Sequence, residues 1–123
     1  MESPVESKNA VNLAEIVTNE KTYLQFDFKD HLDSDNAQKA IVQWKDKMKP
    51  GTKRHLIYNC MFMTGFDTSA RKTWQTTMGT HKHQIGDIWI ISSNVFILGA
   101  AKTMGLLTGF AIKVAKTLND IKD

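Results

Sequence analysis

The stretch RHLIYNCMFMTGFDTSARKTW, residues 54–74, contains the change of pattern that decides the fold. Residues 54–63 are mostly large and apolar, which predicts a strand buried on both faces of a sheet. Thr64 and Gly65 interrupt the run. Beyond them, apolar residues recur at a helical spacing of i, i+4, i+8 and i+12: Phe66, Ala70, Trp74 and Met78. The pattern therefore predicts a buried strand that leads into a helix at Asp67.

A helix is predicted before this stretch, over residues 33–51 (DSDNAQKAIVQWKDKMKPG). Its apolar residues form one stripe at i, i+3, i+4, i+7 and i+11: Ala37, Ala40, Ile41, Trp44 and Met48. Asp33 or Ser34 can cap its start, and the segment KPG ends it after lysines in the last turn.

Residues 11–33 (VNLAEIVTNEKTYLQFDFKDHLD) predict a β-hairpin. Apolar and polar residues alternate from Leu24 to Phe28, and Asn19 and Glu20 supply a polar turn before them. We expect the second strand of this hairpin to lie inside the sheet.

The C-terminal part continues the alternation of strands and helices. DIWIISSN (residues 87–94) predicts another buried strand, and Asn94 can cap a helix that begins near Val95. Glycine and threonine around residues 105–109 end that helix, AIKVAKT (residues 111–117) follows as a last strand, and residues 118–123 form a short tail.

The order of elements indicates an α/β fold. Strands that alternate with helices of this length imply right-handed crossovers and a mainly parallel sheet, with an antiparallel hairpin at its start. We expect a mixed sheet of four or five strands, flanked by three or four helices. The 123 residues suffice for one domain, over residues 11–123, preceded by a flexible lead-in over residues 1–10.

Composition argues against several classes of partner. The net charge of +3 comes from 16 basic and 13 acidic residues that are scattered along the chain, and no basic face is interleaved with aromatic residues. We therefore expect no nucleic-acid binding. The most apolar segment, residues 94–112, has Lys102 near its middle and glycines throughout, so it predicts a core element and not a membrane span.

The cell compartment is predicted from the single cysteine and the N-terminus. Cys60 lies inside an apolar run, which predicts a buried, unreactive thiol in a reducing compartment. The first ten residues, MESPVESKNA, have no apolar core of a signal peptide. We expect a cytoplasmic protein. The sequence leaves the oligomeric state open, a homodimer included.

The sequence gives almost no support for catalysis, so we expect neither an enzyme nor a cofactor. Nucleotide-binding glycine motifs and a G-x-S-x-G elbow are absent from the sequence. His81 and His83 stand two residues apart, and His31 and His55 are isolated in the sequence, so a metal site is not expected.

Asp67, Thr68 and Ser69 stand where a strand meets a helix, at the carboxyl edge of the predicted sheet. Asp67 as N-cap would satisfy one unpaired N–H group of the helix, with Thr68 and Ser69 exposed in the first turn. A phosphate on either hydroxyl would be favoured by the helix dipole and would add about −1.5 to −2 charges to that surface. Plain N-capping, without any further role, remains the alternative.

A second candidate site is an apolar cavity between the third helix and the sheet. Flexible methionines and aromatic residues gather near the sheet end in the sequence, and such side chains can line a ligand pocket. The candidate lining residues are Phe66, Phe96, Met104 and Leu107. Tight packing of this helix on the sheet is the alternative, and the sequence does not choose between them.

Two stretches together resemble the STAS domain, the module shared by sulphate transporters and anti-sigma-factor antagonists. HLDSDNAQKAI (residues 31–41) matches the family's leucine-aspartate pair and the alanine that opens its first helix. In LIYNCMFMTGFDTSARKTW (residues 56–74), four residues lie under the family's Asp-Ser-Ser-Gly motif: Asp67, Thr68, Ser69 and Ala70. The resemblance covers roughly residues 11–121, and a divergent, STAS-like branch of bacterial proteins is the closer match.

The resemblance implies a sheet flanked by helices and a non-enzymatic bacterial regulatory domain. In the antagonists, the hydroxyl after the aspartate is phosphorylated by a partner kinase, which abolishes binding to it. Carried over, Thr68 is the candidate acceptor, with Ser69 beside it, and an anti-sigma factor or kinase would bind at Asp67, Thr68, Ser69 and Arg71. Thr68 replaces the family's serine and Ala70 its glycine, which weakens the phosphorylation prediction more than the fold. Members of the divergent branch are suspected of binding small apolar or lipid-like ligands, which is the alternative function.

Overall fold

The computed structural model describes residues 11–18, 21–48, 53–110, 112–117 and 120–121. The predicted lead-in over residues 1–10 and most of the tail lie outside the described residues. The strands are β1 (Asn12–Thr18), β2 (Lys21–Leu32), β3 (Arg54–Phe66), β4 (Ile85–Ile91) and β5 (Ile112–Ala115). The helices are α1 (Ser34–Lys47), α2 (Thr68–Thr80) and α3 (Val95–Thr108), with a short 3-10 helix, η1 (Lys82–Gln84), before β4.

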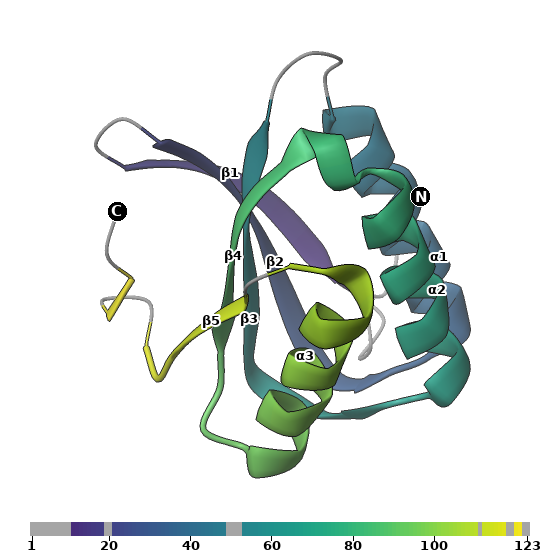
Figure 1. Ribbon diagram of the computed structural model, residues 1–123. Helices are drawn as coiled ribbons and strands as arrows, with labels where there is room; N and C mark the ends of the chain where they lie inside the picture. Colours follow the sequence, from purple (N-terminus) through teal and green to yellow (C-terminus); the bar gives the residue numbers. More distant parts are fainter. Residues whose placement is uncertain (1–10, 19–20, 49–52, 111, 118–119, 122–123) are drawn as a thin grey trace, which may run out of the picture.

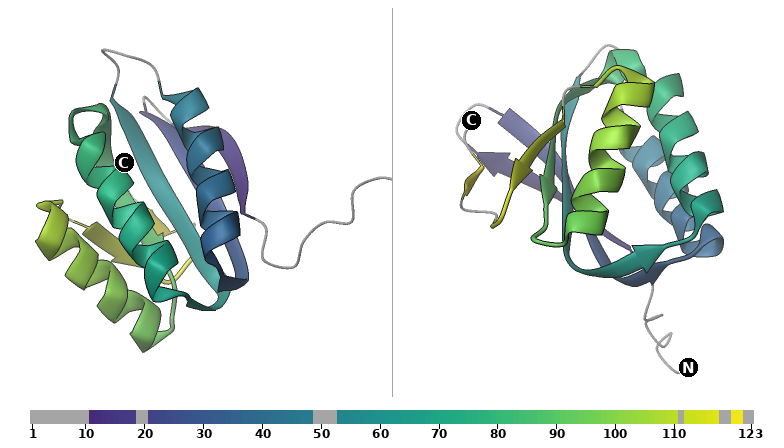
Figure 2. Two further views of the ribbon diagram at one scale, coloured as in Figure 1. Left: turned by 90° about the vertical axis from the view of Figure 1, so that its right-hand side faces the viewer. Right: turned by 60° about the horizontal axis from the view of Figure 1, so that its bottom comes forward.

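The five strands form one mixed sheet in the order β1-β2-β3-β4-β5. β1 pairs antiparallel with β2, and each later strand pairs parallel with the strand before it. α1, α2 and α3 all cover the same face of this sheet (Figures 1 and 2). The predicted α/β fold with an N-terminal hairpin and three flanking helices is therefore confirmed.

β2 and β3 run further than the sequence pattern predicts. The predicted break at Thr64 and Gly65 is wrong, because β3 continues to Phe66 and pairs there with Leu32 of β2. Shifts of register within residues 27–31 and a positive φ of 53° at Asp30 keep the two strands paired across the irregular part. The extended pair carries the chain past the rest of the sheet before α2 begins.

The prediction that the whole strand 54–63 is buried on both faces is also wrong. Pairing of β3 with β4 ends at Asn59 and Ile91, whereas pairing with β2 continues. Beyond Asn59 the strand has one neighbour instead of two, and the side chains of Met61 and Phe62 are exposed.

The main core lies between the sheet and the helices. Five aromatic rings meet there with centroids 5.3–6.3 Å apart in edge-to-face and stacked pairs: Phe26, Phe28, Trp44, Tyr58 and Trp74. The predicted helical stripe of residues 37–48 is buried in full, with Asp33 as the N-cap that accepts from the Asn36 N–H. Such rings contribute large apolar areas, so this cluster fixes how α1 and α2 pack on the sheet.

A smaller cluster occupies the face of the sheet that the three helices leave uncovered. Its buried members are Tyr23, Ile57, Trp89, Ile91 and Ala115, with Ile16 and Ile121 packed against them. All three tryptophans are thus buried, Trp89 in this second cluster.

An ion-pair network surrounds Asp87 next to that cluster. The Asp87 carboxylate lies 2.9 Å from Lys21 Nζ and 3.7 Å from Lys113 Nζ, and 3.8 Å from His55 Nδ1. His55 Nδ1 also accepts the Asp87 N–H at 2.9 Å, so His55 is not isolated as the sequence indicated. The hydrogen bond from Lys21 and the nearby charge of Lys113 lower the pKa of Asp87 below its ordinary value.

A lowered pKa in the folded state stabilises the protein above the ordinary carboxyl pKa, and this contribution is lost as the pH falls through the lowered value. We expect Asp87→Asn to reduce the free energy of unfolding by no more than about 1 kcal/mol at pH 7, since the pair is partly exposed. The deficit should shrink as the pH falls through the lowered pKa of Asp87. Urea unfolding at pH 7, 5 and 3 measures it, with the exposed Asp46→Asn as control. A deficit that stays constant with pH would contradict the electrostatic origin.

Candidate functional site

The predicted site residues Thr68 and Ser69 open α2 at the carboxyl edge of the parallel strands. Both side chains are exposed, and Ala70, which follows them, is buried against the core. The Thr68 hydroxyl makes no hydrogen bond within the part of the chain that the structure describes. It is therefore accessible from solvent and from a docked protein.

Asp67 occupies the N-cap position of α2, but its side chain does not cap the helix. Its Oδ1 lies 2.7 Å from His31 Nε2 at the end of β2, and both side chains are about half exposed. The prediction that the Asp67 carboxylate satisfies an N–H group of the helix is thus wrong, because His31 takes it instead. His31, which is isolated in the sequence, thus has a carboxylate partner in the fold.

Two further contacts join the start of α2 to the start of α1. The Asp67 N–H donates to the carbonyl oxygen of Leu32 at 2.9 Å, and the hydroxyls of Ser34 and Ser69 are hydrogen-bonded to each other. The first turns of both helices therefore lie side by side at one end of the sheet, as Figure 2 also shows. We call the surface of His31, Ser34, Asp67, Thr68 and Ser69 the rim.

Exposed apolar side chains lie at the same edge of the sheet as the rim. Phe62 on β3 is 67% exposed and Phe96, directly after the N-cap of α3, is 83% exposed. Met61 and Val95 beside them are exposed as well. β3 and β4 both run toward this edge, so the four residues follow the last positions at which β3 and β4 pair with each other. Exposed large apolar groups concentrated at one edge are typical of interaction surfaces.

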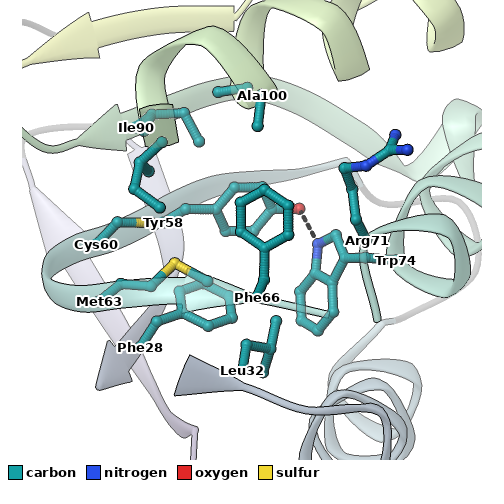
Figure 3. A pocket seen from close by; sticks show the side chains of 12 residues that line it. Phe28, Leu32, Tyr58, Cys60, Met63, Phe66, Arg71, Trp74, Ile90 and Ala100 are labelled. Carbon is teal, nitrogen blue, oxygen red and sulfur yellow. Dashed lines mark hydrogen bonds between the residues drawn. The ribbon is translucent and has the colours of Figure 1, made fainter. Parts of the chain in front are cut away.

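An apolar pocket lies between the sheet, α2 and α3, and its volume is about 70 Å³. Its walls come from β2, β3, β4 and both helices (Figure 3): Phe28, Leu32, Tyr58, Cys60, Met63, Phe66, Arg71, Trp74, Ile90, Ile97, Ala100 and Ala101. Arg71 and Trp74 stand on the side of the pocket opposite Cys60 and Met63 (Figure 3). Arg71 carries the single charge in this lining.

Apart from Arg71, the polar groups in the pocket walls are neutral. The Trp74 Nε1–H donates to the Tyr58 hydroxyl at 2.9 Å. Burial raises the pKa of Tyr58 above its ordinary value and raises the pKa of the Cys60 thiol to about 12. Both groups therefore stay protonated at neutral pH, and the prediction that Cys60 is buried is confirmed.

Of the four residues predicted to line the pocket, one lines it, one does not, and two have side chains outside the described residues. Phe66 lines the pocket, whereas Phe96 points into solvent and takes no part in it. Met104 and Leu107 lie on α3, but their side chains are outside the described residues. Asn94 caps α3 as predicted, accepting from the N–H groups of Phe96 and Ile97.

Arg71 is the fourth residue of the predicted partner-binding set, and the structure places it in the wall of the pocket. It lies next to the rim in sequence but lines the apolar pocket instead. The i, i+3 spacing of Arg71 and Trp74 puts both residues on one face of α2, and this spacing was the signal available in the sequence. For His31 no such signal existed, since irregular strand pairing decides where its side chain points.

No group of three or more His, Cys, Asp or Glu side chains in the described part of the chain could hold a metal ion. No helix over the described ranges has both the length and the apolar character needed to cross a membrane.

Comparison with known proteins identifies the fold. No protein-family model and no curated protein matches the sequence. A solved structure does match: an uncharacterized protein of the DUF3478 family from Shewanella loihica PV-4, described as having a SpoIIAA-like fold. The TM-score is 0.75 with 13% sequence identity, over 98% of this chain and 94% of that chain. The chain therefore has a SpoIIAA-like, STAS-like fold, and at this identity the likeness concerns the fold alone.

Proposed function

We propose that this chain is a non-enzymatic bacterial regulatory domain that docks a protein partner in the cytoplasm through the rim. The observation that carries the proposal is the exposure of the Thr68 and Ser69 hydroxyls at the start of α2, at the same edge as the exposed rings of Phe62 and Phe96. Aromatic side chains are enriched at protein interfaces, and polar residues surround them. An anti-sigma factor or a kinase is the class of partner that the resemblance to the STAS family implies.

Phosphorylation of Thr68 is the proposed control of this docking. A phosphate on Thr68 would lie at the positive end of the α2 dipole, so the modified domain keeps its fold. Its charge would stand close to the Asp67 carboxylate and would have to be desolvated by any partner that covers the rim. Docking is therefore expected to weaken when the charge is added.

The experiment compares Thr68→Glu with Thr68→Ala in a pull-down against a candidate anti-sigma factor or kinase from the same organism. We expect Thr68→Ala to retain the partner and Thr68→Glu to recover roughly tenfold less, as for a charge buried at an interface without a counter-ion. Thr80→Glu, at the other end of α2, serves as a control for added charge. Equal recovery of the partner with Thr68→Ala and Thr68→Glu would contradict the proposed control of docking by phosphorylation of Thr68.

A second candidate function is the binding of a small apolar ligand. The observation that favours it is the pocket of about 70 Å³ between the sheet, α2 and α3, with Phe66 in its wall. Native mass spectrometry of the purified chain tests it. A bound apolar molecule that is retained in gentle ionisation supports this function, and a clean apo mass without any ligand-induced rise in melting temperature contradicts it.

A further inference from the structure

We infer that the pocket between α2 and α3 takes the aliphatic end of a short carboxylic acid, with the carboxylate held at the pocket mouth by Arg71. The inference rests on the second function proposed above, the pocket as a ligand site. It adds the chemical class of the ligand and a residue that selects for it.

The size of the pocket limits the ligand. A cavity volume of about 10–15 Å³ is enough to hold one water molecule. Pockets for drug-sized ligands have volumes of about 300–1,000 Å³. The observed volume of about 70 Å³ therefore suits a branched group of a few carbon atoms, not a whole lipid chain. The remainder of such a ligand must lie at the mouth or outside it.

The interior of the pocket does not favour a charged group. Its walls are apolar side chains, and the hydroxyl of Tyr58 is engaged by Trp74. Transfer of a carboxylate from water into such surroundings, without a charged or hydrogen-bonding partner, has a large unfavourable desolvation free energy. An acid is therefore oriented with its aliphatic end inward and its charge outward.

Arg71 supplies a cation outside the apolar lining: its side chain contributes to the pocket wall, and its guanidinium points away from the other side chains of the lining (Figure 3). Its Nη1 donates to Gln75 Oε1 at 3.2 Å, which holds the side chain along α2. Among the described residues Arg71 has no acidic partner, and neither α2 nor α3 contains an aspartate or a glutamate. A partly buried guanidinium without a carboxylate is matched best by an anion with planar oxygens, because the two can form paired hydrogen bonds.

The test titrates the full chain with 4-methylpentanoate and with 4-methylpentanol, which has the same carbon skeleton without the charge, and follows backbone NMR shifts. We expect the acid to bind roughly fivefold more tightly than the alcohol, the value of one partly exposed ion pair. Arg71→Met keeps the apolar stem and should bind both probes equally, and Arg71→Lys should restore part of the preference. Lys72→Met, an exposed neighbour on α2, should leave the preference unchanged.

A second variant separates the pocket from the charge. Ala100→Leu narrows the pocket and should weaken both probes, while circular dichroism checks that the variant is folded. Binding of both probes with equal affinity to the unmodified chain would overturn the role of Arg71 and leave the apolar site standing. Absence of binding by either probe, or binding that Ala100→Leu does not change, would overturn the site as well. A peptide with a free C-terminal leucine that binds more tightly than the acid would overturn the assignment to a small molecule.

Discussion

Replacing Trp74 by alanine is expected to lower the free energy of unfolding by about 3–5 kcal/mol, the usual cost of removing a buried tryptophan. The side chain is 3% exposed and lies at the centre of the aromatic cluster. Its ring stacks on Trp44 at 5.8 Å and meets Phe26 edge-on at 5.3 Å. Alanine would leave a cavity and would lose the ring contacts to Trp44 on α1 and to Phe26 on β2. The packing of α1 and α2 on the sheet would therefore be weakened. Urea unfolding followed by circular dichroism measures the loss.

A matched pair of phenylalanine variants tests the hydrogen bond separately from the volume. Trp74 Nε1 donates to Tyr58, whereas the buried Nε1 of Trp44 has no acceptor among the described residues. Trp74→Phe removes a satisfied hydrogen bond, and Trp44→Phe removes an unsatisfied donor. We therefore expect Trp74→Phe to be the more destabilising by about 1 kcal/mol. An equal or larger loss for Trp44→Phe would show that the Trp74 hydrogen bond contributes nothing measurable.

Alanine substitutions at two glycines of α3 are expected to change stability in opposite directions. A Cβ at Gly99 would meet no atom within 4 Å, so Gly99→Ala gains helix propensity and should stabilise by about 0.5–1 kcal/mol. A Cβ at Gly105 would lie 2.9 Å from the backbone oxygen of Phe110 and 3.2 Å from Ile112. Gly105→Ala should therefore destabilise by about 1–3 kcal/mol, the usual cost of overpacking.

Thermal unfolding of the two variants beside the unmodified chain gives both signs in one experiment. Both substitutions add the same methyl group to the same helix, so a difference in sign reports the surroundings of the helix and not its propensity. If Gly105→Ala were as stable as Gly99→Ala, the close packing of α3 on the chain that follows it would be refuted.

Much of the fold could be predicted from the sequence because most of its elements carry a single, clear period. The stripe from Ala37 to Met48 has one apolar face, and that face is the buried one. The alternation in residues 24–28 likewise places Leu24, Phe26 and Phe28 on the side of the main core. In both segments the apolar positions of the local pattern are the buried positions, so the pattern was enough to predict the element and its buried face.

The candidate site was harder to predict, for two physical reasons. α3 is apolar at most positions, so its sequence does not distinguish the buried Ile97 from the exposed Phe96. At the ends of β2 and β3, register shifts break the two-residue period, so the pairing of His31 with Asp67 cannot be read from spacing. Proximity of Thr68 and Ser69 to the strand end could be predicted, because it depends only on where the strand leads into the helix.

The strand order has a consequence for how the chain assembles during synthesis. Each strand pairs with the one made immediately before it, so no strand must be inserted between two that already hold each other. A nascent chain released as far as Thr80 already contains β1, β2 and β3 together with α1 and α2. The remaining strands then add one at a time to a single growing edge, in the order in which the ribosome delivers them.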